Sequence, residues 1–566
     1  MKSPWAKEWR AAEQKERNSI RDKDVLGPLQ LIPPGRKVRT MRYVYKWKPP
    51  TDAGSEPRAK VRATCRDFQW LGEVGETYAP TGRGLTFRLF LLIAYMLGMP
   101  VHHVDVETAF LNAELRPDEE YWTTPLPDEV KEAPPGWGYR LRKSIYGLRV
   151  APRHWYQMLS DCLFKWGFQR SQLDTCLFWM SLPHGGLLMV LIYVDDILIA
   201  GPTLAIIQSL KDYLASVFTI VDLGEAKKYL GIRIQRLAGD ILSLDQQDYA
   251  EEILRRFKDH WKPLFGGKKP KKTPLPADAQ KFIAVEVGPD MTETEKSWFE
   301  SFPYRSVIGC LLYLALNTRP DLSFAVGFLA RASSKPTYGA CYCAAWLLSY
   351  LSLTVEMGIE YTMARLADWH AFVDADWAGE LARRRSTSGF VIFMCGGPLA
   401  WGSKLMQTIA SSTMQAEFQS YYYCVTSLLY IKHMFEEIGI PYKKKVIMFT
   451  DAQAAIRAAH NPEAHQATKH FEVKYWWIRQ FIGEGAEAFI EMHFLPTVLM
   501  VADILTKVSK ALAVFLHTDH LMGRMDRGTR DVFEAKQAGK WQTPGFEDLP
   551  EFHDSSSSEG SDSEEA

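Results

Sequence analysis

Several features that would place this chain in a common protein class are absent from its 566 residues. Its eight cysteines are scattered, and the one close pair, Cys341 and Cys343, lacks the spacing of a zinc site. We therefore expect reduced intracellular thiols. The longest apolar run, Leu89–Val101, contains Gly98 and Pro100 and is too short to span a bilayer, so no membrane partner is expected. No secretory signal is visible, because the N-terminus is charged from Lys2 onward.

An excess of charge is also lacking, since 67 Lys and Arg balance 67 Asp and Glu. The distribution is uneven, however. Residues 546–566 hold eight acids and no Lys or Arg, which leaves 67 basic and 59 acidic residues in the rest. A mildly basic body with an acidic, Ser-rich tail is compatible with a partner that carries phosphates. We expect this tail to be disordered.

A pair of adjacent carboxylates interrupts an apolar stretch near the middle of the chain. Leu187–Val194 is apolar, Asp195 and Asp196 follow, and the apolar pattern resumes at Ile197. This pattern predicts two buried strands joined by a hairpin whose tip carries negative charge. Asp is also a common turn residue, so the hairpin alone gives even odds of a purely structural role.

A second strand-like segment with an acidic end favours the functional interpretation. Val101–Phe110 contains Asp105, and if Asp105 lies beside Asp195 the two form the oxygen-rich site that Mg²⁺ prefers. Two Mg²⁺ ions there, with Mn²⁺ as a substitute, would activate a primer 3′-hydroxyl and stabilise pyrophosphate. The pattern therefore points to nucleotidyl transfer.

The later part of the chain carries another set of acids. Asp374 ends a predicted strand, Glu417 opens a long predicted helix, Asp451 ends a second strand, and Asp503 lies in a short helical segment. A single acid at a helix start is usually a cap. The ordered set of four instead predicts a two-Mg²⁺ site for phosphodiester hydrolysis. We prefer Asp374 over its neighbour Asp376 because Asp374 follows the apolar strand directly.

Helices and strands alternate through the first half of the chain. Helices are predicted over Trp5–Arg17, Leu85–Leu97, His154–Gly167 and Ala205–Phe218, and a strand over Tyr43–Trp47. The pattern indicates a multidomain protein of α/β and α+β class. The Gly/Pro/Lys-rich segment 265–276 is predicted to be a domain joint.

Together these segments resemble the reverse transcriptase and ribonuclease H region of copia-type LTR retrotransposon polyproteins. The resemblance covers roughly residues 25–508. The motifs that carry it, in order, are Asp105–Asn112 (DVETAFLN), Ser144–Tyr156 (SIYGLRVAPRHWY), Tyr193–Asp196 (YVDD), Asp222–Ile232 (DLGEAKKYLGI), Tyr304–Asp321 (YRSVIGCLLYLALNTRPD), Asp374–Ala378 (DADWA), Arg384–Gly389 (RRSTSG), Lys469–Tyr475 (KHFEVKY) and Ala502–Lys507 (ADILTK).

The resemblance implies a right-hand polymerase of fingers, palm and thumb followed by a ribonuclease H-like α/β domain. The implied segments are fingers and palm (37–264), thumb and connection (265–365) and the ribonuclease H-like domain (366–508). Composition, apart from the resemblance, predicts a polar N-terminal leader (1–36) and a C-terminal extension with the acidic, Ser-rich tail (509–566). The implied partners are an RNA template, a DNA or RNA primer, RNA–DNA hybrid and dNTPs, in cytoplasmic particles or the nucleus. The oligomeric state is left open.

The resemblance also implies residue roles. Polymerase metal ligands would be Asp105, Asp195 and the Val106 carbonyl, with Asp196 in support. Substrate would contact Lys60, Arg62, Phe110 (facing the sugar) and Val150, and the primer grip would be Leu230, Gly231 and Ile232. The nuclease ligands and catalytic acids would be Asp374, Glu417, Asp451 and Asp503. Apart from the resemblance, Lys60 and Arg62 are ordinary strand-face charges and Phe110 is a core residue.

Three positions depart from the family pattern. Val150 replaces a customary Gln, which removes an amide expected near the nucleotide and template. Asp67 replaces a customary Gly and adds negative charge near the expected phosphates, and Gln415 stands at a common Glu. Neither a zinc knuckle, an aspartic-protease motif nor an integrase-like His-His-Cys-Cys pattern is visible, so we expect a processed or truncated downstream part of a polyprotein. Two alternatives stay open: an impaired remnant that binds nucleic acid without polymerising, and a host-recruited scaffold that acts through the acidic tail.

Overall fold

The computed structural model describes residues 5–48, 56–68, 76–183, 185–362, 369–380, 383–442, 445–460, 477–509 and 511–524. Met1–Gly523 form one compact unit. A second unit, Arg524–Ala566, lies outside the described residues except for Arg524, and so does the predicted motif Lys469–Tyr475. No described helix has the length and hydrophobicity to cross a membrane.

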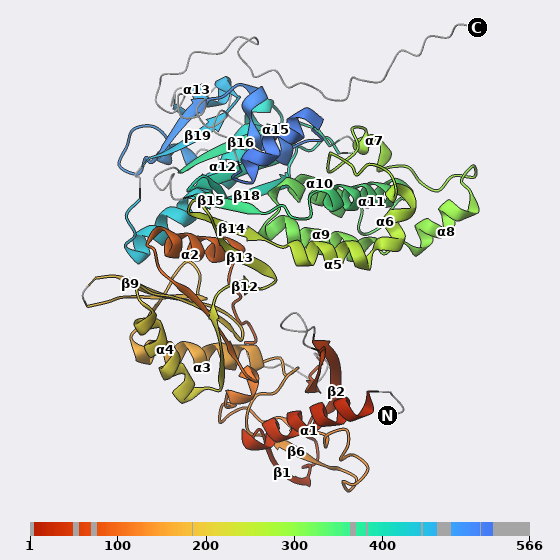
Figure 1. The fold of residues 1–566 in the computed structure, drawn as a ribbon, viewed down its shortest axis with the longest axis vertical. Coiled ribbons are helices and arrows are strands. Elements are labelled where there is room, and N and C mark those ends of the chain that lie inside the picture. The colour runs from red at the N-terminus through yellow and green to blue at the C-terminus, as the bar shows by residue number, and fades with distance from the viewer. Residues whose placement is uncertain are drawn as a thin grey trace. The chain divides into compact units, whose positions relative to one another are not determined.

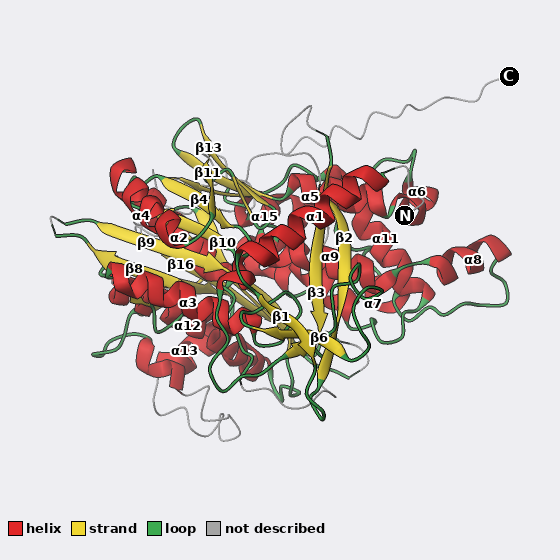
Figure 2. Cartoon of the chain, turned by 90° about the horizontal axis from the view of Figure 1, so that it is seen from below, coloured by secondary structure: helices red, strands yellow, loops and turns green. Residues whose placement is uncertain are grey.

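The first sheet has five strands and one long covering helix. Its strands, in spatial order, are β1 (Leu26–Leu31), β6 (Trp137–Leu141), β5 (Trp122–Thr123), β2 (Val38–Lys48) and β3 (Arg58–Arg66). Figure 2 shows β2 and β3 side by side as a long antiparallel pair beside helix α1 (Ala6–Asp22). The Glu16 side chain accepts a hydrogen bond from the Ala63 amide at 2.9 Å. Residues expected as a leader therefore pack onto this sheet.

The second sheet has six strands, all antiparallel to their neighbours. The order is β11 (Ile220–Glu225), β4 (Val101–Val106), β10 (Asp196–Ala200), β9 (Leu187–Tyr193), β8 (Leu177–Ser181) and β7 (Gln169–Arg170). The accompanying helices are α2 (Gly84–Met96), the short helix η2 (Ala109–Asn112), α3 (Ala151–Trp166) and α4 (Leu204–Val217). Helix α3 begins three residues before the predicted His154, because Pro152 fits the first helical turn.

Burial on both faces explains the unbroken apolar run of β9. Leu187, Met189 and Leu191 pack in the cluster that contains α2. The alternate residues Leu188 and Val190 pack in the cluster that contains α3 and α4. Figure 1 shows α2 on one side of this sheet and α3 and α4 on the other. The predicted buried hairpin is confirmed.

A small sheet and a helical layer follow. The sheet orders β12 (Lys228–Tyr229), β13 (Ile232–Leu237), β14 (Ile241–Asp245) and β15 (Ile359–Thr362). The helices are α5 (Gln247–Arg256), α6 (Lys258–Phe265), α7 (Ala279–Phe282), α8 (Glu293–Ser301), α9 (Tyr304–Asn317), η3 (Pro320–Leu322), α10 (Ser323–Ala330) and α11 (Tyr338–Leu353). Helices α5 and α6 share one apolar cluster with α9–α11, so this cluster crosses the predicted joint at residue 265.

The last sheet is mixed. Its order is β18 (Gly397–Leu405), β17 (Thr387–Met394), β16 (Trp369–Asp376), β19 (Val446–Thr450) and β20 (Ile490–Phe494), and β16–β19 and β19–β20 are the parallel pairs. The helices here are α12 (Thr413–Ile438), α13 (Gln453–His460), η5 (Ile478–Phe481), η6 (Thr497–Leu499), η7 (Val501–Leu505) and α15 (Ala511–Leu521). The strands predicted to end at Asp374 and Asp451 are present as β16 and β19.

Burial of His517 on α15 gives a pH-dependent contribution to stability. Burial, and secondarily the charge of Lys507, lowers its pKa to about 4. An unfolded His titrates near pH ~6.5, so its contribution is complete above that pH and is lost as the pH falls toward 4. The free energy of unfolding should fall between pH 7.5 and 4.5 in both wild type and His517→Gln. In His517→Gln this fall should be smaller than in wild type by about 3 kcal/mol. Urea titrations at pH 7.5 and 4.5, with exposed His433→Gln as control, measure this. Equal acid sensitivity of wild type and His517→Gln would contradict it.

Candidate active sites

The predicted Asp-Asp turn lies against strand β4. Tyr193 pairs with Asp196 across the hairpin, so Val194 and Asp195 form a two-residue connection. Asp196 is also the register partner of Asp105 on the neighbouring strand. The Val106 amide donates a hydrogen bond to the Asp195 carbonyl at 2.9 Å. The structure therefore brings Asp105 and Asp195 together at one end of the central strands.

Electrostatics indicate that this end of the sheet favours a cation. Burial, and then the charges of Asp195 and Asp196, raise the pKa of Asp105. Burial also raises the pKa of Asp195, and Asp196 adds to that effect. Carboxylates that repel one another in a partly buried site fit a divalent ion. The Asp196 carboxylate is itself 3.1 Å from His103 Nε2, a contact that the sequence did not suggest.

Strand β3 brings positive charge toward the same carboxylates. Burial, followed by Arg62 and Lys48, lowers the pKa of Lys60 to about 8, while Asp105 and Asp195 oppose this shift. The Arg62 guanidinium lies 4.6 Å from the centre of the Tyr146 ring. Lys60 and Arg62 are thus coupled by charge to the candidate metal ligands.

The β2–β3 ribbon has one face without any acidic side chain. Residues directly opposite in an antiparallel pair project to the same side. We call this face the basic ribbon face. The opposite face of the ribbon carries Tyr45 and Trp47, which pack against Trp9 of α1. The residues of the basic ribbon face are Thr40, Arg42, Val44, Lys46 and Lys48 of β2 and Arg58, Lys60, Arg62, Thr64 and Arg66 of β3. Of these cations only Lys60 and Arg62 were predicted as site residues, although the two-residue alternation of both strands was a signal for the others.

The predicted nucleotide-contact residues Phe110 and Val150 differ in placement. Phe110 on η2 is partly buried, with its ring 5.5 Å from that of Tyr146 in an edge-to-face arrangement. Val150 is 1% exposed and packs in an apolar cluster with Leu111 and Ile145. This burial gives no support to a substrate contact by Val150, which stays a prediction.

The predicted primer grip forms the turn between β12 and β13. Tyr229 pairs with Ile232, and Leu230 and Gly231 between them have φ angles of 49° and 79°. Both values fit a two-residue hairpin turn with left-handed backbone. The Tyr313 hydroxyl of α9 donates a hydrogen bond to the Leu230 carbonyl at 2.5 Å. The turn is therefore anchored to the helical layer.

Asp67 is buried in an ion pair rather than facing open space. Its carboxylate accepts from Arg39 Nε at 2.8 Å and from the Arg149 amide at 3.1 Å. A buried cation that loses its partner destabilises a protein by about 3–5 kcal/mol. We expect Asp67→Asn to lower the free energy of unfolding of this region by about 3 kcal/mol. Chemical denaturation, with the exposed pair member Asp248→Asn as control, measures it. An unchanged midpoint would show that the Arg39 pair adds no stability.

The four acids of the second set meet at one end of the mixed sheet. Ligand oxygens of Asp374, Glu417 and Asp451 all lie within 4.8 Å of one another. Among the described residues, this is the only group of three or more His, Cys, Asp or Glu that could hold a metal ion by this measure. Asp503 on η7 is coupled to them, since burial and then the charge of Asp374 raise its pKa to about 7.

A glycine allows this convergence. Gly389 on β17 is the register partner of Asp374. A Cβ atom at Gly389 would lie 2.5 Å from Thr506 Cγ2 and 3.0 Å from Leu505 Cβ. The absence of a side chain lets η7 approach the sheet, where Thr506 Oγ1 donates to Asp374 Oδ2 at 2.5 Å. Close packing therefore explains why glycine stands at the end of the Arg384–Gly389 motif.

The acid cluster has the electrostatics of a cation site. Burial, then Asp374 and Asp451, raise the pKa of Glu417 well above its usual value. Glu417 Oε2 is buried without a hydrogen-bond partner. An unpartnered carboxylate oxygen among other acids fits divalent-ion coordination, so the residues present suit Mg²⁺.

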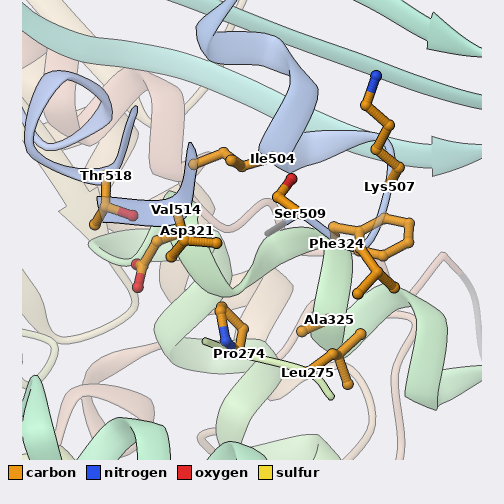
Figure 3. A pocket seen from close by; sticks show the side chains of 11 residues that line it. Pro274, Leu275, Asp321, Phe324, Ala325, Ile504, Lys507, Ser509, Val514 and Thr518 are labelled. Atoms are coloured by element: carbon orange, nitrogen blue, oxygen red, sulfur yellow. The ribbon is translucent and has the colours of Figure 1, made fainter. Parts of the chain in front are cut away.

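Lys507 is a further charged neighbour of these acids and was not among the predicted site residues. Its Nζ lies 2.9 Å from Asp503 Oδ1. Figure 3 shows its side chain on the wall of a pocket with Ile504, extending away from the Asp321 and Thr518 side. The positive charge of Lys507 partly compensates the negative charge of the acids. Its place in the motif Ala502–Lys507 (ADILTK) was the sequence feature that could have identified it.

Sequence comparisons relate most of the chain to known proteins. Residues 29–263 match the family described as reverse transcriptase (RNA-dependent DNA polymerase). The chain is 30% identical over 480 residues to the retrovirus-related Pol polyprotein from transposon TNT 1-94 of Nicotiana tabacum, covering 84% of this chain and 35% of that protein. It is 32% identical to the Pol polyprotein from transposon RE2 of Arabidopsis thaliana, covering 84% and 31%.

A shorter relative is covered almost completely. The chain is 30% identical over 321 residues to a putative transposon Ty5-1 protein of Saccharomyces cerevisiae, covering 56% of this chain and 97% of that protein. A solved foamy viral protease–reverse transcriptase in complex with double-stranded DNA has a TM-score of 0.42 at 10% identity, covering 87% of this chain and 70% of that one. The chain spans about a third of the length of the two plant polyproteins. It belongs to the copia-type retrotransposon polyproteins and contains their reverse transcriptase domain.

Proposed function

We propose that the chain is an RNA-directed DNA polymerase with an attached ribonuclease H. The observation that carries the proposal is the presence of two separate acid clusters, one at the Asp105–Asp195 end of the six-stranded sheet and one around Asp374, Glu417 and Asp451. Each cluster suits divalent ions, and phosphoryl transfer on nucleic acids commonly uses pairs of such ions.

For polymerisation, the protein's own groups would bind and orient the substrates. Mg²⁺ held by Asp105, Asp195 and the Val106 carbonyl would supply activation of the primer 3′-hydroxyl and charge stabilisation. Lys60 and Arg62 would neutralise the triphosphate of the incoming dNTP. The remaining cations of the basic ribbon face would bind phosphates of the template strand, which predicts salt-dependent affinity.

For RNA cleavage, the second acid cluster would act on an RNA–DNA hybrid. Asp374, Glu417, Asp451 and Asp503 would hold Mg²⁺, which supplies the activated water. Lys507 would keep the orientation of Asp503 through their ion pair. Thr506 would do the same for Asp374 through its hydroxyl.

One assay tests both activities on the purified chain. A labelled DNA primer on a labelled RNA template, with Mg²⁺ and dNTPs, should yield extended primer and shortened RNA. Folded protein that does neither with Mg²⁺ or Mn²⁺ would refute the proposal.

The alternative function, binding of nucleic acid without polymerisation, rests on Val150. The side chain packs among apolar residues and offers no hydrogen bond. Salt-dependent hybrid binding without dNTP incorporation, with activity restored by Val150→Gln, would favour this alternative.

A further inference from the structure

The turn that carries Asp195 has an unfavourable backbone conformation. Val194 has a φ of 60°, in the left-handed region. A β-branched side chain is rarely found there, because its Cβ substituents crowd the adjacent backbone. The conformation persists only where surrounding contacts hold it.

Two hydrogen bonds hold the two peptide carbonyls of this turn. The Asp195 carbonyl accepts from the Val106 amide, which ties the turn to β4. The Val194 carbonyl accepts from the Trp155 indole Nε1 at 2.6 Å. Trp155 lies on α3, is 1% exposed, and contacts the Phe218 ring edge-to-face at 5.1 Å. Its indole therefore has little freedom to turn away.

Packing of the Val194 side chain also holds the turn in place. The side chain packs at the edge of the apolar cluster that also contains Trp155. The turn is thus fixed on the α3 side by one hydrogen bond and by apolar packing, and on the β4 side by another hydrogen bond. Loss of the indole N–H leaves the Val194 peptide free to rotate toward a relaxed conformation, and Asp195 follows that peptide.

We propose that Trp155 is a positioning residue for polymerisation: its indole N–H holds the left-handed Val194 peptide so that Asp195 stays beside Asp105. This inference rests on the proposed polymerase function. It assigns to the tryptophan of the SIYGLRVAPRHWY motif a role that neither its burial nor its position in the sequence implies.

A double-mutant cycle tests the proposal. Trp155→Phe removes the indole N–H, and Val194→Gly removes the steric cost of positive φ. We expect Trp155→Phe to lower kcat for single-nucleotide incorporation about tenfold in the Val194 background, with KM for dNTP changed less than about twofold. In the Val194→Gly background, the same change should cost less than about threefold, because glycine adopts the turn unaided.

The cycle separates positioning from packing. The smaller ring of Phe leaves the same space in both backgrounds, so a packing effect alone would lower kcat equally in each. Trp179→Phe is the matched control, because the buried Trp179 Nε1 has no hydrogen-bond partner. Its kcat should stay within about twofold of wild type. Equal losses for Trp155→Phe in both backgrounds, or no loss in either, would overturn the proposal.

A second measurement does not depend on activity. Hydrogen–deuterium exchange of peptides that cover β9–β10 and Val106 should speed up in Trp155→Phe and return toward wild type when Val194→Gly is added. If wild-type protein incorporates no dNTP, the proposed function fails, and the exchange pattern still decides whether Trp155 holds the turn. Unchanged exchange in Trp155→Phe would refute the inference.

Discussion

Replacement of Asp195 by asparagine should reduce primer extension by at least about a thousandfold. The Asp195 carboxylate lies in the turn beside Asp105, and burial together with Asp196 makes its charge costly without a cation. Asparagine keeps the shape but loses the charge, and a metal site then loses several kcal/mol of transition-state stabilisation, each ~1.4 kcal/mol being tenfold in rate. Single-nucleotide incorporation with Mg²⁺ is the measurement.

Two controls distinguish this effect from unfolding. Asp212→Asn changes an exposed acid on α4, where the carboxylate accepts a hydrogen bond from Gln208, and should leave incorporation unchanged. RNA cleavage in the hybrid should survive Asp195→Asn, since the second acid cluster is separate. Extension at wild-type rate by Asp195→Asn would remove this carboxylate from the mechanism.

Replacement of Asp451 by asparagine should have the opposite effect on the two activities: RNA cleavage should be lost and primer extension kept. The Asp451 carboxylate converges with Asp374 and Glu417, and it accepts a hydrogen bond from Thr497 at 2.6 Å. Asp451→Asn should lower cleavage of the RNA strand by at least about a thousandfold, because one ligand charge of the cluster is lost. Primer extension should remain. A labelled RNA–DNA hybrid resolves the two products in one experiment.

A binding measurement accompanies that activity test. Mg²⁺ should raise the melting temperature of wild type, since it binds the folded acid cluster and relieves the repulsion around Glu417. The rise should be smaller in Asp451→Asn and unchanged in Glu487→Gln, which alters an exposed acid of the same unit. Cleavage that persists in Asp451→Asn would contradict the assignment of the nuclease site.

Local pattern predicted the elements that carry both sites. The apolar run broken by Asp195 and Asp196 predicted a strand, a tight turn and a second strand, and the structure has that hairpin. The order of Asp374, Glu417 and Asp451 likewise predicted their convergence, because Asp374 and Asp451 follow short apolar runs and Glu417 lies near the start of a long helix.

What the sequence could not reveal depends on contacts between distant residues. Asp67 was expected to add charge near phosphates, but it pairs with Arg39 and Arg149, and nothing local indicates those partners. The contact of Asp196 with His103 depends on the register of β10 against β4. Strand register and loop packing are tertiary properties, so residue pattern alone leaves them open.

Anomalous diffraction from crystals soaked in Mn²⁺ tests most directly whether this one chain holds two separate divalent-ion sites. The account predicts one set of manganese peaks between the carboxylates of Asp105 and Asp195, and a second set among Asp374, Glu417 and Asp451. Manganese that binds at neither group, in crystals that otherwise reproduce this fold, would contradict it.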